Sequence, residues 1–351
     1  MSISVKNNKV LIGLSGGVDS AVSAWLLLKA GYSVEGVFMK NWSETSGLLR
    51  SDCPWLTDRR EALKVAAFLG IKLHTLDFEK EYEEKVMEYF FENYKNLQTP
   101  NPDVFCNKEI KFNLLYKWAM DQGFDYLATG HYAATDGSVL AIPKDTFKDQ
   151  TYFIYNIKPD QLPHLIFPLQ DYLKGEVKKL AKKIGLPNAE RKESMGICFV
   201  GKIRLQEFLS QKIKPKPGNI VDTKGNILGK HQGLHNFTLG QREGINLSSG
   251  PWYVLEKNPE NNTLVVGHNP HDEKLKFGRV NLHSLNWLSE QIPDSVIKCR
   301  FRHQGQLVDC EVSKQKTGAK VVFKDPQYSL ASGQSIVLYK DSIVLGGGII
   351  N

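Results

Sequence analysis

The segment Ser15–Ser20, with the sequence Ser-Gly-Gly-Val-Asp-Ser, has the composition of a loop that binds phosphate groups. Its two glycines let backbone N–H groups approach an anion closely, and its two serine hydroxyls can donate hydrogen bonds to phosphate oxygens. The apolar run Val10–Leu14 precedes the loop and a helix-like stretch follows it, so the positive end of a helix dipole would face the anion. The segment predicts a nucleotide site at a strand-to-helix turn.

Two common nucleotide motifs do not fit this loop. It contains no lysine, which excludes a Walker A motif, and no Gly-x-Gly-x-x-Gly pattern, which excludes the dinucleotide fingerprint. Asp19 places a carboxylate where a phosphate is expected, and this suits contact with a Mg²⁺ ion carried by the phosphates. A glycine-rich turn that binds no ligand is the alternative explanation.

The elements around the loop alternate between strand-like and helix-like segments. Predicted strands cover 10–14, 34–39, 71–76 and 126–129, and predicted helices cover 19–30, 59–69, 79–94, 109–120 and 174–184. This alternation predicts an α/β fold with a doubly wound parallel sheet. Pro100 and Pro102 are expected to exclude helix and central strand from 98–107, and a second loop is expected at 188–201.

The second half of the chain is predicted to be mostly β. A linker-like run at 212–218 is followed by short β-like runs separated by turn signals, and 335–339 with 343–345 is predicted to form a hairpin. We therefore predict a catalytic domain at 1–208, a small β-rich central domain at 209–275 and a C-terminal β-barrel at 276–351.

Composition limits the class of protein. The chain has 351 residues, 41% hydrophobic and 24% charged, which is typical of a globular protein, and it has no apolar run of about 18 residues. The short segment before Val10 leaves no room for a signal peptide, so a cytoplasmic location is expected. The five cysteines are odd in number and widely spaced, unlike a secreted disulfide framework or a structural zinc site.

The net charge of +7 is concentrated in the C-terminal part of the chain. Residues 211–351 carry 18 Lys and Arg against 12 Asp and Glu, whereas residues 1–210 carry 27 against 26. Such an excess could hold a polyanion, and a solvated basic face explains it equally well.

The order of several motifs resembles that of one enzyme family. The Ser15–Ser20 loop is similar to the PP-loop of ATP pyrophosphatases, which have an adenine nucleotide alpha-hydrolase-like fold. Further matching motifs carry the likeness across the chain to the tRNA-specific 2-thiouridylase family: 36–42, 99–103, 106–107, 110–112, 129–132, 148–150, 196–199, 239–242 and 346–348.

This resemblance implies adenylation of the C2 oxygen of the wobble uridine at position 34 of tRNA, followed by sulfur transfer from a persulfide. It implies Cys198 as the persulfide carrier, Cys106 as the second catalytic cysteine that forms a disulfide with it, and Asp103 as a general acid or base. It also implies nucleotide-contacting residues: Gly13, Leu14, Ser15, Gly16, Gly17, Val18, Asp19, Ser20, Met39 and Gly130. The residues implied to contact tRNA or the target base are Asn101, Pro102, Asp103, His131, Lys148, Asp149, Gln150 and Gln334. Arg300, Phe301 and Arg302 alternate charged and aromatic side chains in a predicted strand, a pattern that suits phosphate contact and base stacking, and an exposed β face would show the same pattern.

The implied partners are MgATP, a tRNA for Glu, Gln or Lys, and a sulfur donor that is either a cysteine desulfurase or a relay protein. No membrane partner is expected. Cys53, Cys299 and Cys310 are expected to be structural. The sequence departs from the family pattern at Leu97-Gln98, where Gly-Arg is expected, and at Ser332, where proline is expected.

Two other functions remain open at this point. An amide-forming PP-loop synthetase, such as GMP synthetase, would use the same nucleotide loop but would not need two placed thiols. A non-catalytic RNA-binding protein with the same fold would bind tRNA without releasing AMP.

Overall fold

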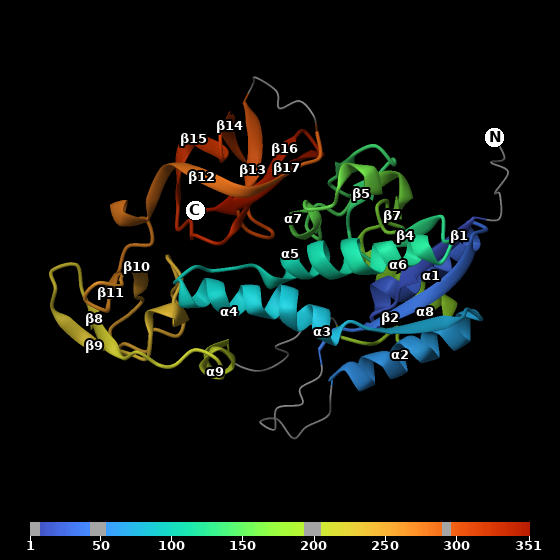
Figure 1. Ribbon diagram of the computed structural model, residues 1–351, viewed down its shortest axis with the longest axis horizontal. Helices are drawn as coiled ribbons and strands as arrows, with labels where there is room; N and C mark the ends of the chain where they lie inside the picture. The colour runs from blue at the N-terminus through green and yellow to red at the C-terminus, as the bar shows by residue number, and fades with distance from the viewer. Residues whose placement is uncertain (1–7, 43–53, 193–204, 290–295) are drawn as a thin grey trace.

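A five-stranded parallel sheet carries the glycine-rich loop, in the order β3-β2-β1-β4-β7 (Figure 1). Its strands are β1 (Lys9–Gly13), β2 (Ser33–Lys40), β3 (Leu73–Asp77), β4 (Tyr126–Ala128) and β7 (Leu165–Ile166). Every pairing in this sheet is parallel, which confirms the prediction. The strand order reverses between β1 and β4, and open sheets of this kind bind ligands at such a switch point.

Both faces of this sheet are covered. Val10 and Ile12 of β1 pack into a cluster with α1 (Val18–Lys29), α2 (Pro54–Leu69) and α8 (Lys174–Ile184). Leu11 points to the opposite face, where it belongs to a cluster that includes Phe112 and Leu115. Because alternate residues of a strand face opposite sides, a run of apolar residues marks a strand buried on both faces.

The computed structural model describes residues 8–42, 54–192, 205–289 and 296–351. Within these ranges no helix has both the length and the apolar character needed to cross a membrane.

A helical arm follows β3 and extends away from the sheet (Figure 1). It consists of α3 (Glu79–Tyr82), a π-helical turn at Glu83–Met87 and α4 (Glu88–Lys95), which together agree with the predicted helix at 79–94. The chain then returns through α5 (Pro102–Cys106), a π-helical stretch at Asn107–Leu115 and α6 (Tyr116–Asp121). Within an α-helix, π-helical turns are rare and are frequent at functional sites.

The prediction that 98–107 excludes helix was wrong. Pro102 occupies the first turn of α5, where a helix has no intrahelical acceptor for the missing N–H group. Asn101 caps the helix, because its Oδ1 accepts hydrogen bonds from the N–H groups of Asp103 at 3.1 Å and Val104 at 3.3 Å. Pro102 and the Asn101 cap therefore fit the beginning of the helix.

The central domain contains a four-stranded sheet in the order β10-β11-β8-β9. Its strands are β8 (Gly218–Val221), β9 (Ile227–His231), β10 (Tyr253–Asn258) and β11 (Thr263–Gly267). The short helix α9 (Leu205–Ser210) precedes this sheet and packs through Phe208 and Leu209 against the helical arm.

A six-stranded antiparallel barrel forms the C-terminal part of the chain, closed by pairing between β12 and β17. Its strands are β12 (Lys276–Trp287), β13 (Ile297–Arg300), β14 (Val308–Gln315), β15 (Gly318–Tyr328), β16 (Ser335–Lys340) and β17 (Ile343–Ile350). The antiparallel β16–β17 pair confirms the predicted hairpin. The catalytic domain extends this sheet through β5 (Ala134–Thr135) and β6 (Leu140–Ala141), because Ala141 of β6 pairs with Ile343 of β17. A short helix, α7 (Thr151–Ile154), lies between the barrel and the parallel sheet.

Candidate functional site

The Ser15–Ser20 loop lies between β1 and α1, as predicted, and it is located at the switch point of the parallel sheet. Hydrogen bonds inside the loop fix its shape: Ser20 Oγ accepts from the N–H of Ser15 at 3.3 Å and donates to Gly17 O at 3.1 Å. Gly16 has φ +77°, and a Cβ atom there would lie 2.5 Å from the carbonyl oxygen of Asp58. Glycine is therefore required at position 16 by both conformation and space.

Gly130, which follows β4, packs directly against this loop. A Cβ atom at Gly130 would lie 2.8 Å from the backbone nitrogen of Ser20. The absence of a side chain lets the end of β4 reach the first turn of α1, whose N–H groups have no intrahelical acceptors. Gly130 thus packs against the loop, and Met39 lies near the end of β2, the strand next to β1.

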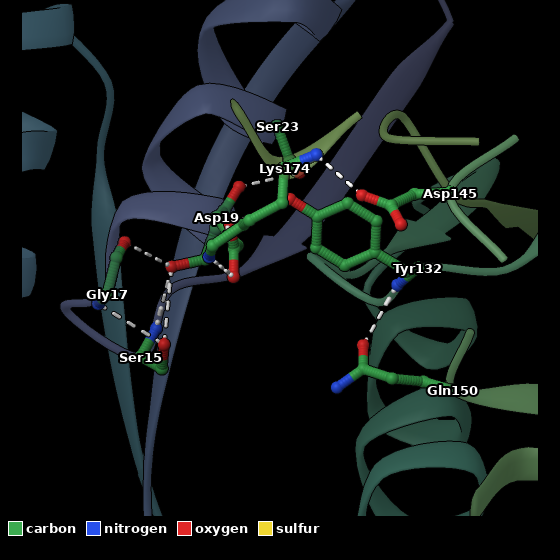
Figure 2. A network of polar contacts seen from close by, with 9 residues as sticks. Ser15, Gly17, Asp19, Ser23, Tyr132, Asp145, Gln150 and Lys174 are labelled. Carbon is green, nitrogen blue, oxygen red and sulfur yellow. Dashed lines mark hydrogen bonds and ion pairs between the residues drawn. The ribbon is translucent and has the colours of Figure 1, made fainter. Parts of the chain in front are cut away.

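Asp19 has a partner that sequence reasoning missed. Both of its carboxylate oxygens lie 2.7 Å from Lys174 Nζ, and its Oδ1 accepts a hydrogen bond from Tyr132 OH at 3.2 Å (Figure 2). The backbone N–H of Lys174 donates to Asp145 Oδ2 at 2.7 Å, which fixes the start of α8 beside the loop. The lysine ammonium therefore lies against Asp19 of the glycine-rich loop.

This arrangement bears on the Mg²⁺ contact predicted for Asp19. The lysine ammonium contacts both Asp19 oxygens that would bind the metal. In the parts of the chain that the structure covers, there is no group of three or more His, Cys, Asp or Glu side chains that could hold a metal ion. The protein alone thus forms no divalent-metal site there, and the Asp19–Mg²⁺ contact stays a prediction that depends on phosphate oxygens.

Two further side chains missed by sequence reasoning hold the loop from outside. Asn188 Nδ2 and Arg191 Nη1 donate to the carbonyl oxygen of Gly16 at 2.8 and 3.0 Å. Arg191 also forms an ion pair with Asp58 at the beginning of α2. No local pattern separates these polar residues from solvated ones, since their role depends on where the 188–191 segment packs.

Cys106 lies at the end of α5 and is buried, with 4% of its surface exposed. Burial raises the pKa of its thiol to about 11, Lys111 acts in the opposite direction, and Asp103 raises it further. The thiol is therefore protonated at neutral pH in this structure. A thiolate is the reactive form of cysteine, so reaction requires a rearrangement that exposes the sulfur or brings a cation closer.

His131 follows Gly130 and donates to or accepts from Thr129 Oγ1 through its Nδ1, at 2.8 Å. Burial, followed by the positive charge of Lys111, lowers the pKa of His131 well below its usual value, so the ring is neutral at pH 7. Lys111 acts electrostatically on both His131 and Cys106. Gly130 therefore packs against the glycine-rich loop, and Lys111 links its neighbour His131 to Cys106 through electrostatics alone.

The remaining cysteines divide into two groups. Cys198 and Cys53 lie outside the described residues, so the predicted Cys106–Cys198 disulfide stays a prediction. Cys299 and Cys310 are buried free thiols on the neighbouring barrel strands β13 and β14, as expected for structural residues.

The residues predicted to contact tRNA have different environments. Arg302 is exposed and donates to Ser329 O at 2.7 Å, whereas Phe301 packs partly into the barrel core. Gln150 is tied to Tyr132 by two hydrogen bonds of 2.9 Å, and Lys148 is partly exposed. Gln334 has a buried side-chain oxygen that bonds to none of the described residues. A contact of any of these residues with tRNA stays a prediction.

Asp149 and Arg300 form an ion pair that is buried between the catalytic domain and the barrel. Arg300 Nη1 lies 2.6 Å from Asp149 Oδ2, and the two side chains are 8% and 1% exposed. Asp149 Oδ1 also accepts from the N–H and Oγ1 of Thr151, at 2.9 and 2.7 Å. The pair joins the two domains, and neither charge faces solvent.

The fold and site define a class of protein: a nucleotide-binding α/β domain of the HUP type followed by two β-rich domains. Residues 8–202 match the family model described as tRNA methyl transferase HUP domain. Residues 206–268 match the model of the tRNA methyl transferase PRC-barrel domain, and residues 278–350 match the aminomethyltransferase beta-barrel domain. The boundaries predicted at 208 and 275 stay predictions.

Full-length relatives identify the family within this class. The chain is 41% identical to tRNA-specific 2-thiouridylase MnmA 2 of Aliarcobacter butzleri, over 99% of each chain. It is 42% identical to tRNA-specific 2-thiouridylase MnmA of Shewanella sp. strain MR-4, over 98% of this chain and 96% of the relative. The chain belongs to the MnmA family of tRNA-specific 2-thiouridylases.

A solved 4-thiouridine synthetase in complex with RNA and ATP is a more distant match, with 21% identity and a TM-score of 0.37. The match covers 58% of this chain and 50% of that one, and it is too remote to support an inference.

Proposed function

We propose that this protein uses MgATP to convert the wobble uridine at position 34 of tRNA into 2-thiouridine. The observation that carries the proposal is that Gly130 packs against the glycine-rich loop, while its neighbour His131 and the Cys106 thiol are both influenced by the charge of Lys111. One bound uridine would then meet both an ATP phosphate and a thiol. Membership of the MnmA family supports this choice of reaction over amide formation.

The proposed reaction has three steps. The C2 oxygen of uridine attacks the α-phosphorus of ATP and displaces pyrophosphate, which gives an O2-adenylated base. The terminal sulfur of a Cys198 persulfide then attacks C2, and AMP leaves with the former C2 oxygen. The Cys106 thiolate attacks the Cys198 sulfur and breaks the persulfide bond, which leaves a Cys106–Cys198 disulfide and the sulfur on C2. A dithiol reductant restores both thiols.

The residues of this chain would act mainly by binding and positioning. The N–H groups of the glycine-rich loop would bind the phosphates, and Lys174 would move from Asp19 toward phosphate oxygens when MgATP binds. Met39 would meet the adenine through its backbone, and Gly130 would contact the nucleotide. Asp103, on the α5 helix with Cys106, would serve the base as acid, base or hydrogen-bond partner.

Burial of Cys106 opposes the loss of its thiol proton. The pKa of about 11 leaves little thiolate at neutral pH, and the nearby Lys111 is the cation that favours the thiolate. We propose that tRNA binding opens the environment of Cys106, which allows the thiol to lose its proton. The proton would pass to solvent or to Asp103.

Binding of tRNA would use the exposed basic residues of the barrel and of the segment before α7. Arg302 and Lys148 would contact phosphates, and His131, Gln150 and Gln334 would contact tRNA near the anticodon. Asp149, Arg300 and Phe301 would stabilise the structure of this surface. Phe147, which is 71% exposed beside Lys148, offers a ring for base stacking. Affinity should fall steeply with salt.

We propose tRNAs for Glu, Gln and Lys as substrates, and a cysteine desulfurase or a sulfur relay protein as the donor. The protein is expected to act in the cytoplasm.

The deciding experiment combines the full chain with tRNA, MgATP and a persulfide donor, and measures AMP and 2-thiouridine. Equal amounts of both products support the proposal. Release of AMP without a thiolated nucleoside would indicate another acceptor, such as ammonia, and tRNA binding without AMP would indicate a non-catalytic protein. Full 2-thiouridine formation by a Cys198→Ser variant would sink the persulfide mechanism.

A further inference from the structure

The segment Leu97–Thr99, which we name the junction segment, contacts all three domains. It connects α4 to Asn101–Cys106, and both accessory domains hold it. The N–H of Thr99 donates to Ser332 O in the barrel at 2.8 Å, and Thr99 Oγ1 lies 3.0 Å from Thr238 Oγ1 in the central domain. Any movement of the C-terminal domains therefore acts on the chain just before α5.

Leu97 has a backbone conformation that usually requires glycine. Its φ is +59°, and it ends α4 with two hydrogen bonds: Leu97 N–H to Tyr94 O at 3.0 Å and Gln98 N–H to Asn93 O at 2.9 Å. This pair of bonds is the Schellman motif, in which the left-handed position is usually glycine. A leucine at that position is strained, so contacts outside the helix must stabilise it.

The central domain supplies those contacts. The Leu97 side chain packs against the apolar core that contains Phe237, Val254 and Leu264. Lys257 of β10 donates through Nζ to the carbonyl oxygen of Leu97 and, at 3.1 Å, to that of Phe237. The central domain thus holds both the side chain and the carbonyl group of Leu97.

Lys257 carries its charge without an anionic partner among the described residues. The side chain of the adjacent Glu256 binds Lys274 instead, and the charge of Lys257 acts on the titratable ring of His235. The pKa of His235 is lowered by burial and by the charges of His231 and Lys257. Burial lowers the pKa of Lys257 to about 8. The ammonium form makes charge-assisted hydrogen bonds, and a neutral amine makes weaker ones.

We infer that Lys257 is a positioning residue for thiolation, which locks the junction segment and so places Asp103 and Cys106 against the target base. The inference rests on the roles proposed above for those two residues. Asn101, two residues after the junction segment, caps α5 through the N–H groups of Asp103 and Val104. Release of the Leu97 carbonyl would therefore loosen the cap and shift the helix that carries the thiol.

The lock depends on the proton carried by Lys257. Because its pKa is about 8, the lysine is mostly charged at pH 7 and mostly neutral at pH 9. The lock should accordingly be strongest below pH 8 and weaken as the pH rises through that value. Dividing the turnover of a variant by that of the wild type at each pH cancels the titration of the reacting thiols, which both proteins share.

The test uses Lys257→Met in the full chain, with Lys224→Met as the matched control. Lys224 lies on an exposed turn of the same domain, so its loss removes the same charge without touching the junction segment. Hydrogen–deuterium exchange of the 97–106 peptide reports the lock directly, and the 174–184 helix reports whether the rest of the chain is folded. Turnover and KM for tRNA are measured at pH 7 and pH 9.

We expect Lys257→Met to speed exchange of the 97–106 peptide and to lower kcat at pH 7 by about tenfold, with KM within about twofold. The deficit should shrink severalfold at pH 9, and Lys224→Met should show neither effect. Unchanged exchange in Lys257→Met would overturn the lock, whatever the chemistry. Faster exchange with unchanged kcat would overturn the positioning role and leave the proposed function intact. Absence of thiolation in wild type, with faster exchange confined to the variant, would refute the proposed function and leave the lock in place.

Discussion

Replacing Asp149 with alanine would leave Arg300 buried between the catalytic domain and the barrel without its anion. The substitution removes an ion pair of 2.6 Å and the two hydrogen bonds that Thr151 donates to the carboxylate. The Nε atom of Arg300 already bonds to none of the described residues, and Tyr339 offers the guanidinium a ring face 5.5 Å away. The buried Arg300 guanidinium would therefore have few interactions to offset its desolvation.

The expected loss of stability follows from burial. Removing one partner of a buried ion pair costs about 3–5 kcal/mol, because the other charge stays desolvated. This corresponds to roughly a hundredfold to a few thousandfold in the equilibrium between the folded and unfolded states. Asp149→Ala combined with Arg300→Met should cost less than the sum of the two single substitutions, by about 1–3 kcal/mol, because the pair disappears as a unit.

The barrel supplies a matched control in Lys298 and Asp309. Their ion pair is 2.8 Å long and joins β13 to β14, but its side chains are 49% and 35% exposed. Asp309→Ala should therefore cost at most about 1 kcal/mol. Urea unfolding of the full chain, followed by tryptophan fluorescence and circular dichroism, gives both values. Equal losses for Asp149→Ala and Asp309→Ala, or full additivity in the double variant, would refute the argument from burial.

Three further predictions concern the site and the junction segment. Leu97→Gly should be less destabilising than Leu97→Ala by about 1 kcal/mol in urea unfolding. Both variants lose the packing of the leucine side chain, and glycine alone relieves the strain of the left-handed conformation. A greater loss of stability in Leu97→Gly would contradict the assigned strain. Alkylation of Cys106 at pH 8, followed by peptide mass spectrometry, should be at least about 100-fold slower than in the denatured chain, because burial stabilises the protonated thiol. The alkylation rate should increase as the pH rises toward 11. Equal rates in the folded and denatured chains would show that the sulfur is exposed. Lys174→Met should weaken ATP binding, measured by calorimetry, about tenfold or more, since a charge-assisted contact is lost. Lys183→Met, at an exposed position on the same helix, is the control. Equal ATP affinities of the two variants would show that Lys174 does not contribute to the site.

Local patterns in the sequence predicted the framework of the site. Strand β1 and helix α8 lie where the apolar run and the helical periodicity placed them, because those patterns depend on the backbone and on near neighbours. The glycine-rich loop was predicted for the same reason, since its two glycines and two serines lie within six residues. The catalytic roles of Cys106 and Cys198 are predictions from family resemblance, which carries information that periodicity lacks.

The helix at Pro102–Cys106 shows where local reasoning failed. Local reasoning treats proline as a helix breaker, although at the first position of a helix it costs no hydrogen bond and fixes φ favourably. The choice between breaker and first residue depends on whether Asn101 can cap the helix. That in turn depends on the junction segment, which the two C-terminal domains hold.

The sequence by itself determined the alternation of strands and helices, the glycine-rich loop and the β-rich second half, because each depends on patterns within a few residues. Tertiary structure alone decided which charges would be buried and with which partners. Asp19 meets Lys174 across 155 positions, Asp149 meets Arg300 across 151, and Lys257 meets Leu97 across 160. A lysine or arginine has the same local pattern whether it faces solvent or a carboxylate. Its energy is fixed by desolvation and pairing, and these exist only after distant segments have packed together.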